Sequence, residues 1–180
     1  MTAESDSEPE IPHLVVMGVS SVGKSTVARE VAERLGYEFA EGDEFHPPAN
    51  VAKMSAGVPL DNEDRMPWLH ALVRWAREQD VAGRATVTAC SALKRSYRDI
   101  LRQVPNTYFV CLVGDQELLL ERMNERDHFM PPELLKSQLA DLEPLAPEES
   151  GIVVDVTAPP EQVVASVLAE LGAGRFSRDH

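Results

Sequence analysis

The chain has few of the residues on which membrane-bound, disulfide-stabilised and polyanion-binding proteins depend. Of its 180 residues only two are cysteines, 6% are aromatic, and 17 Lys and Arg stand against 30 Asp and Glu. A formal net charge of −13 leaves no general basic face, so we expect neither nucleic acid nor a membrane as a partner. No apolar run approaches the roughly 18 residues of a membrane span, and the N-terminus lacks the pattern of a signal peptide. We therefore expect a cytoplasmic protein.

The two cysteines, Cys90 and Cys111, lie in apolar stretches. That placement predicts buried free thiols rather than a disulfide or a catalytic nucleophile. Residues 1–10 are acidic and almost without large apolar side chains, so we predict a disordered tail. The last eight residues, 173–180, are predicted to be frayed, which leaves 11–172 as one domain without repeats or linkers.

A phosphate-binding pattern lies near the N-terminus, between a predicted strand at 13–17 and a predicted helix at 25–35. Two glycines followed by Lys and Ser have the required spacing in Gly18-Val19-Ser20-Ser21-Val22-Gly23-Lys24-Ser25. Such a loop wraps backbone N–H groups around phosphate, while Lys24 attracts the β and γ oxygens and the Ser25 hydroxyl can bind Mg²⁺. The predicted nucleotide-binding residues are Gly18, Ser20, Ser21, Val22, Gly23, Lys24, Ser25 and Thr26.

Strands and helices are predicted to alternate along the rest of the chain. Further strands are expected at 37–40, 85–89, 108–113 and 152–156. Helices are expected at 49–55, 64–79, 94–103, 116–125, before 142, and at 160–171. Five apolar strands alternating with helices predict a three-layer α/β domain with a parallel sheet and right-handed crossovers.

The phosphate loop alone does not name a reaction, because switches, motors, transporters and small-molecule kinases all use one. The chain lacks the Asn-Lys-x-Asp pattern with which a GTP-hydrolysing switch reads guanine. It is also short for a motor or a transporter domain, so a compact kinase remains. A kinase of another small hydroxy acid, such as shikimate, and a regulatory nucleotide-binding module without transfer activity are the alternatives.

Stretches beyond the phosphate loop carry a more specific family resemblance, which spans residues 13–171. They read Met17-Gly18-Val19-Ser20, Gly42-Asp43-x-x-His46-Pro47, Lys53-Met54, Pro59-Leu60, Asp64-Arg65-x-Pro67-Trp68-Leu69, Cys90-Ser91-Ala92-Leu93-Lys94-x-x-Tyr97-Arg98-Asp99 and His128-Phe129-Met130. Together these stretches resemble the bacterial gluconokinases. The resemblance implies phosphorylation of D-gluconate at its 6-hydroxyl, with ATP as the donor and Mg²⁺ as the cofactor. It also implies a shikimate-kinase-like P-loop fold with sheet order 2-3-1-4-5, a small lid and a homodimer.

Candidate residues for this chemistry gather after the predicted strands, at the edge where open parallel sheets bind ligands. Gluconate presents a carboxylate and a row of hydroxyls, so its pocket needs fixed cations and neutral donors. The expected substrate contacts are Asp43, His46, Asn50, Lys53, Arg65, Lys94, Arg98 and His128. Asp43 is the candidate general base, with a water-mediated Mg²⁺ ligand as its alternative role; Ser25 is the other metal ligand.

Two arginines, Arg122 and Arg126, stand four residues apart before the predicted lid. We predict that they clamp the γ-phosphate and count them as catalytic with Lys24 and Asp43, while neutralising a helix C-terminus is the alternative. The chain departs from the family pattern at the lid, which is one residue shorter. It departs again in the phosphate loop, where Ser21 and Val22 replace Gly and Ser. Because Ser lacks the freedom of glycine at positive φ, the loop is expected to hold a conformation that an ordinary residue tolerates.

Overall fold

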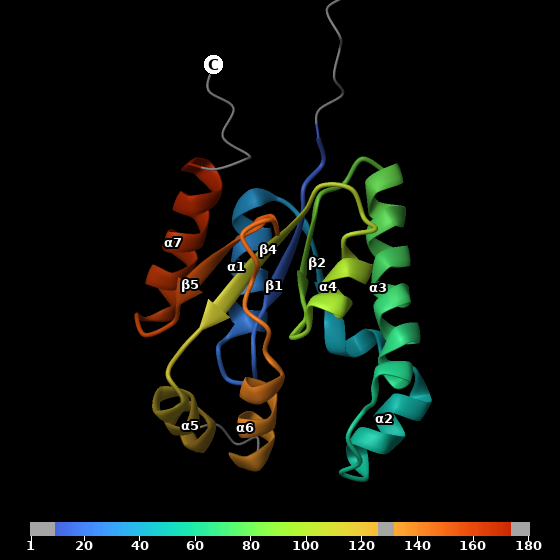
Figure 1. The fold of residues 1–180 in the computed structure, drawn as a ribbon. Helices are drawn as coiled ribbons and strands as arrows, with labels where there is room; N and C mark the ends of the chain where they lie inside the picture. The colour runs from blue at the N-terminus through green and yellow to red at the C-terminus, as the bar shows by residue number, and fades with distance from the viewer. Residues whose placement is uncertain (1–9, 126–131, 174–180) are drawn as a thin grey trace, which may run out of the picture.

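The protein is described here by a computed structural model that covers residues 10–125 and 132–173 (Figure 1). Residues 1–9 and 174–180 of the predicted tails at 1–10 and 173–180, as well as Arg126 and His128, lie outside these described residues.

Five parallel strands form one sheet in the order β2-β3-β1-β4-β5, as the resemblance implied. The strands are β1 (His13–Met17), β2 (Glu38–Glu41), β3 (Thr86–Ala89), β4 (Thr107–Val113) and β5 (Gly151–Asp155). The central strand β1 pairs with β3 on one side and β4 on the other, so that His13 lies between Thr86 and Thr107. The loop that follows β1 therefore emerges from the middle of the sheet.

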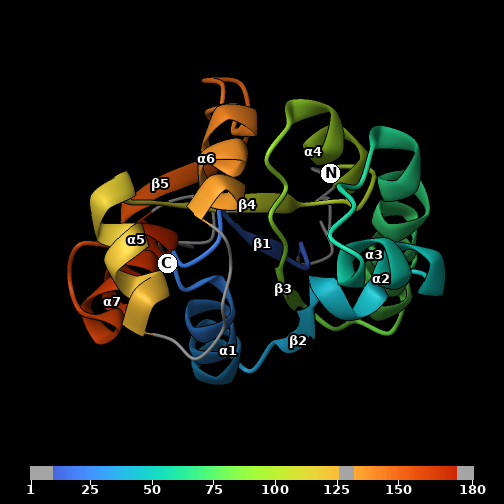
Figure 2. The ribbon, with the colours of Figure 1, turned by 90° about the horizontal axis from the view of Figure 1, so that it is seen from below.

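Helices cover both faces of the sheet and extend beyond one edge. They are α1 (Lys24–Leu35), the 3₁₀ helix η1 (Gly42–Phe45), α2 (Pro48–Ser55), α3 (Asn62–Val81), α4 (Arg95–Leu101), α5 (Gln116–Glu125), α6 (Pro132–Asp141) and α7 (Pro160–Ala173). Helices α1 and α7 lie on one face, and α3 and α4 on the other. Beyond the carboxyl ends of the strands, α5 and α6 stand on one side and α2 on the other (Figure 2).

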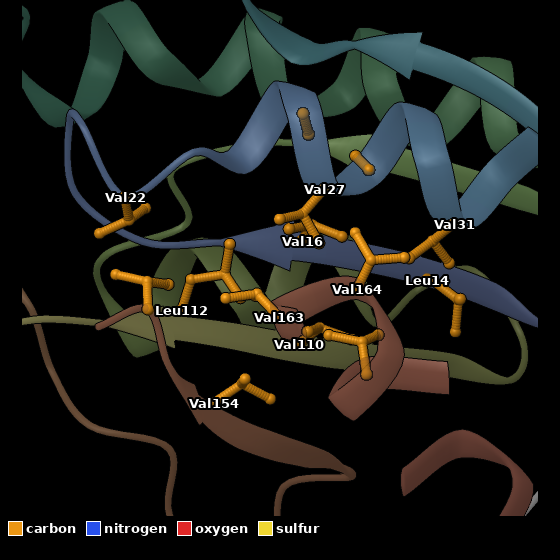
Figure 3. Packing of buried hydrophobic residues seen from close by; sticks show 14 of the residues in the cluster. Leu14, Val16, Val22, Val27, Val31, Val110, Leu112, Val154, Val163 and Val164 are labelled. Carbon is orange, nitrogen blue, oxygen red and sulfur yellow. The ribbon is translucent and has the colours of Figure 1, made fainter. Parts of the chain in front are cut away.

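The core has two halves because successive side chains of a strand point to opposite faces of the sheet. Leu14 and Val16 of β1 pack with apolar side chains of α1 and α7 (Figure 3). Val15 and Met17 pack with α3 and α4. All five residues of β1 are buried, as expected for a parallel strand covered on both faces.

Two local features differ from the sequence-based predictions. Residues 42–45 fall outside every predicted strand and helix, but they continue β2 as the helical turn η1. Helix α3 begins at Asn62, two residues before the expected start at 64, because Asp61 and Asp64 form a reciprocal capping box. Among the described helices, none is both long and apolar enough to span a membrane.

Candidate active site

The phosphate loop connects β1 to α1 at the centre of the sheet. Gly18 has φ 146°, and a Cβ there would lie 2.7 Å from the carbonyl oxygen of Leu112, so no larger residue fits. Gly23 (φ 90°) precedes α1 and offers no side chain to its first N–H groups, while Lys24 Nζ donates to Val19 O at 3.0 Å. A turn of uncapped N–H groups beside a lysine fits the phosphates of a nucleotide. The exposed Thr26 lies in the same turn.

The two unusual residues of the loop behave differently from each other. Ser21 adopts φ 70°, in the left-handed region that favours glycine. The expectation that the loop avoids such a conformation is therefore wrong, and Ser21 holds it at a cost of about 1–2 kcal/mol. The Val22 side chain is buried in the core (Figure 3), so only its backbone is free to face a nucleotide.

A carboxylate that sequence reasoning did not single out, that of Glu41, contacts Ser25 of the phosphate loop. The Ser25 hydroxyl donates to Glu41 Oε2 at 2.5 Å. Asp43 follows two residues later in η1 and is exposed. Within 10–125 and 132–173, no three His, Cys, Asp or Glu side chains gather to hold an ion by themselves. Hydroxyl and carboxylate oxygens fit a magnesium ion that completes its shell with phosphate oxygens and water.

Charged side chains from the phosphate loop, β2 and η1 all act on Cys90, just after β3. Burial raises the pKa of the Cys90 thiol to about 12, and the charges of Asp43, Lys24 and Glu41 also act on it. These three charged groups therefore lie near the end of β3. A thiol with this pKa is protonated at neutral pH, which agrees with the predicted inert cysteine.

The acceptor side is built around Trp68 of α3. Its indole Nε1 donates to the carbonyl of Gly42 at 2.7 Å, and its ring stacks on His46 with centroids 4.3 Å apart. Burial lowers the pKa of His46. The negative charge of Asp43 raises this pKa and the positive charge of Arg65 lowers it, so the three side chains lie near one another. Trp68 is buried, and its contacts with Gly42 and His46 position the turn that carries Asp43 and His46.

Two of the predicted substrate contacts are already engaged in bonds that brace the site. Asn50 is buried, and its amide nitrogen contacts the Asp64 carbonyl at 2.8 Å and His46 Nδ1 at 3.2 Å. Lys53 Nζ lies 2.9 and 2.8 Å from the two carboxylate oxygens of Asp64, and this hydrogen bond raises the pKa of Lys53. The structure thus gives both residues a bracing role around the start of α3.

Tyr97 of α4 joins two predicted cationic contacts. Its hydroxyl accepts from Arg65 Nη1 at 2.8 Å and donates to Asn62 Oδ1 at 2.6 Å. Its ring lies 5.4 Å from the Arg65 guanidinium carbon and 5.9 Å from Lys94 Nζ. Arg65 and Lys94 are half-buried and lie near the same aromatic ring, which suits them to an anionic group of a ligand.

Arg98 does not have the role that the sequence suggested, and its assignment as a substrate contact is corrected. Its side chain is 0% exposed and forms an ion pair with the equally buried Glu149, 2.8 Å from Nε to Oε1. Its Nη1 donates to the carbonyls of Ala92 and Leu93. Arg98 therefore stabilises the turn before α4, where Ala92 has φ 43°, instead of contacting a ligand.

The loop after α6 is fastened to the same turn by Glu143. Its backbone N–H donates to the carbonyl of Leu93 at 2.8 Å. Its carboxylate accepts from the backbone N–H of Arg95 at 3.1 Å. The end of α6 is thereby fixed to the start of α4.

Arg122 lies in the last turn of α5, and its Nη2 donates to the carbonyl of Val156 at 2.6 Å. No described contact places it against the phosphate loop, so its predicted clamp role remains a prediction. A residue that sequence reasoning missed does reach the loop. Gln138 of α6 accepts a hydrogen bond from the backbone N–H of Ser20, with a donor–acceptor distance of 2.7 Å.

Comparisons with known proteins agree with this geometry. A family model described as shikimate kinase matches residues 20–172. The chain is 48% identical to a gluconokinase of Gluconobacter oxydans, covering 89% of this chain and 91% of the relative. It is 43% identical to a thermoresistant gluconokinase of Escherichia coli, covering 89% and 94%. It is also similar to the crystal structure of a gluconokinase from Sinorhizobium meliloti, with TM-score 0.82, 46% identity, and coverage of 90% and 92%.

The phosphate loop after the central strand and the sheet order 2-3-1-4-5 define a phosphate-loop kinase with the shikimate kinase fold. Within this class the relatives over most of the chain are gluconokinases. The chain belongs to the gluconokinase family.

Proposed function

We propose that this protein transfers the terminal phosphoryl group of ATP to the 6-hydroxyl of D-gluconate, giving ADP and 6-phospho-D-gluconate. The proposal is carried by two features of a chain of this family: a phosphate loop after the central strand, and a pair of cations, Arg65 and Lys94, near the ring of Tyr97. The loop suits the donor phosphates. Arg65 and Lys94, which both lie near the ring of Tyr97, suit the gluconate carboxylate.

The transfer breaks the bond from the γ-phosphorus to the bridging oxygen and forms a bond to the 6-oxygen of gluconate. Loop N–H groups and Lys24 bind the negatively charged phosphate oxygens. Asp43 accepts the hydroxyl proton; its alternative role is to hold Mg²⁺ through water. A bound magnesium ion would neutralise further phosphate charge, held by Ser25 and Asp43 with Glu41 hydrogen-bonded to Ser25.

An acceptor screen with coupled detection of ADP tests the reaction. We expect turnover with D-gluconate well above that with shikimate or other sugar acids. Lys24→Ala should lower kcat at least about 100-fold, because a preorganised charge at the transferred group is lost. Lys136→Ala, which removes an exposed lysine of α6, is the matched control and should turn over normally. Equal turnover of gluconate by the Lys24 variant, or none by the unaltered protein, would contradict the proposal.

The base role of Asp43 has its own test. Asp43→Asn should lower kcat about 100-fold or more with little change in ATP affinity, since general base catalysis contributes about 10²–10⁴-fold. Glu44→Gln alters the next carboxylate of η1, which is also exposed, and should have little effect. A kcat for Asp43→Asn near that of the unaltered protein would exclude proton transfer to Asp43.

Three further properties are proposed on the basis of family membership. Magnesium dependence predicts that EDTA abolishes turnover and that added Mg²⁺ restores it. A homodimer predicts twice the chain mass of 19.8 kDa in light scattering. Location in the cytoplasm predicts that the protein fractionates with soluble cell contents.

A further inference from the structure

Gln138 is the only described residue of α6 whose side chain hydrogen-bonds to the phosphate loop, 118 residues away in sequence. A backbone N–H can only donate, so the amide oxygen Oε1 must face Ser20. The amide nitrogen Nε2 must then point the other way. Within residues 10–125 and 132–173, the Gln138 side chain makes no other hydrogen bond. The half-buried Nε2 thus carries two donors that no described residue uses.

The Gln138 amide contacts the same part of the loop as the loop lysine, Lys24. Lys24 Nζ donates to the carbonyl of Val19, and Gln138 accepts from the N–H of Ser20. These two groups belong to the same peptide unit, so Lys24 and Gln138 bind opposite edges of one peptide. The loop lysine of such proteins reaches the β- and γ-phosphates. Gln138 therefore contacts the same peptide of the loop as the lysine that serves the phosphates.

The acceptor contacts come from a different part of the fold. His46, Arg65 and Tyr97 belong to the segment after η1 and to α3 and α4, whereas Gln138 approaches on α6. Figure 2 shows α6 and α2 on opposite sides of the edge where the strands end. The end of α6 also lies beside the start of α4. The Gln138 side chain, however, hydrogen-bonds to the phosphate loop and to none of these acceptor residues, which favours the donor phosphate over gluconate as its partner.

The geometry points to Gln138 as a catalytic residue whose Nε2 donates to an oxygen of the transferred γ-phosphoryl group, with Oε1 fixed by Ser20. A neutral amide donor in a fixed orientation stabilises developing negative charge without reorganisation. The inference rests on the proposed function in one respect, because it takes ATP as the phosphoryl donor.

Two substitutions separate this role from a purely structural one. Gln138→Met keeps the length but loses both hydrogen-bonding groups. Gln138→Glu keeps an acceptor for Ser20 and replaces the Nε2 donors with a second carboxylate oxygen. If Gln138 serves only to dock α6, Glu should restore what Met loses. If Nε2 contacts the phosphoryl group, Glu should be the worse of the two, because its charge repels the phosphate.

Binding with Mg²⁺ present distinguishes the phosphate that is contacted. We expect Gln138→Met to weaken a non-hydrolysable ATP analogue about 10-fold, and Gln138→Glu to weaken it more, with ADP affinity changed less than two-fold. Preserved ADP affinity also shows that the variants are folded. Ser137→Glu adds the same charge at the preceding exposed position of α6 and should bind both nucleotides normally.

Four results would overturn the inference. They are unchanged analogue binding in both variants, equal weakening of analogue and ADP, restoration by Glu, and a change confined to the KM for gluconate. The nucleotide measurements contain no gluconate. Selective loss of analogue affinity in a protein that does not phosphorylate gluconate would therefore sustain this inference and refute the proposed acceptor.

Discussion

Replacing Glu149 by Gln should be among the most destabilising conservative changes in the protein. The Glu149 side chain is 1% exposed and lies 2.8 Å from Arg98 Nε and 2.7 Å from Arg102 Nη1. It also accepts from the backbone N–H of Ala146 at 2.7 Å. Gln has nearly the same shape but no charge, and its NH₂ group would face guanidinium donors. The buried Arg98 would be left without a counter-ion.

The pKa of Glu149 sets the scale of this effect. Burial by itself raises the pKa, but the hydrogen bonds from Arg98, the Ala146 N–H and Arg102 outweigh it and hold the pKa at about 2, against an ordinary 4.5. A difference of about two and a half pH units corresponds to about 3 kcal/mol of stability. Breaking a buried ion pair costs about 3–5 kcal/mol in general. We therefore expect Glu149→Gln to lower the free energy of unfolding by about 3 kcal/mol at pH 7.

Urea denaturation at several pH values tests this reasoning. Because the folded pKa is depressed, the stabilisation is complete above pH 4.5 and is lost as the pH falls toward 2. The gap between the unaltered protein and Glu149→Gln should therefore narrow below pH 4.5. The control is Glu148→Gln, whose carboxylate pairs with Arg95 at 2.5 Å but is 62% exposed, and it should leave the midpoint nearly unchanged. Equal urea midpoints for Glu149→Gln and the unaltered protein, or a gap that persists in acid, would refute the argument.

Three further predictions follow from the site. Tyr97→Phe removes the hydroxyl that holds Arg65 but keeps the ring, so the KM for gluconate should rise about 10-fold in steady-state assays while the KM for ATP stays constant; a parallel rise in both would contradict this role. Ser21→Gly relieves a left-handed conformation but loosens the unfolded chain, for a net gain of about 0.5 kcal/mol in urea denaturation; a loss would show that the serine is not strained. Burial lowers the pKa of His46 below its ordinary 6.5, so kcat/KM for gluconate should fall with acidity only below pH 6.5. His46→Gln should remove this fall at acid pH. If the fall is unchanged in the variant, another group is responsible for it.

The sequence predicted the parts of the molecule that are determined by residues close together in the chain. The phosphate loop is recognisable because its glycines, Lys24 and Ser25 each serve one ligand from consecutive positions. The five strands are recognisable because burial on both faces makes them apolar throughout. The order of the strands could not be predicted from local sequence, because the pairing of β2 with β3 depends on how the crossovers pack. Only the family resemblance supplied this order.

The site residues that sequence reasoning misjudged owe their roles to distant partners. Arg98 was expected to contact the ligand because no residue near it in sequence indicates its pairing with Glu149, 51 residues away. Gln138 carries no local sign of its contact with Ser20. Glu41 did carry a signal. It stands two residues before Asp43 at the end of β2, where a second carboxylate can reach Ser25.

The attachment of Glu143 to the turn before α4 limits how the chain length can vary. Gln138 and Glu143 are five positions apart, and Glu143 is fixed by Leu93 and Arg95. One extra residue between them would rotate Gln138 by about 100° around the axis of α6 and remove it from the phosphate loop. An insertion at the exposed turn around Gly83 displaces no contact of this kind. Among related chains, the segment 139–142 should therefore keep a constant length even where its side chains change.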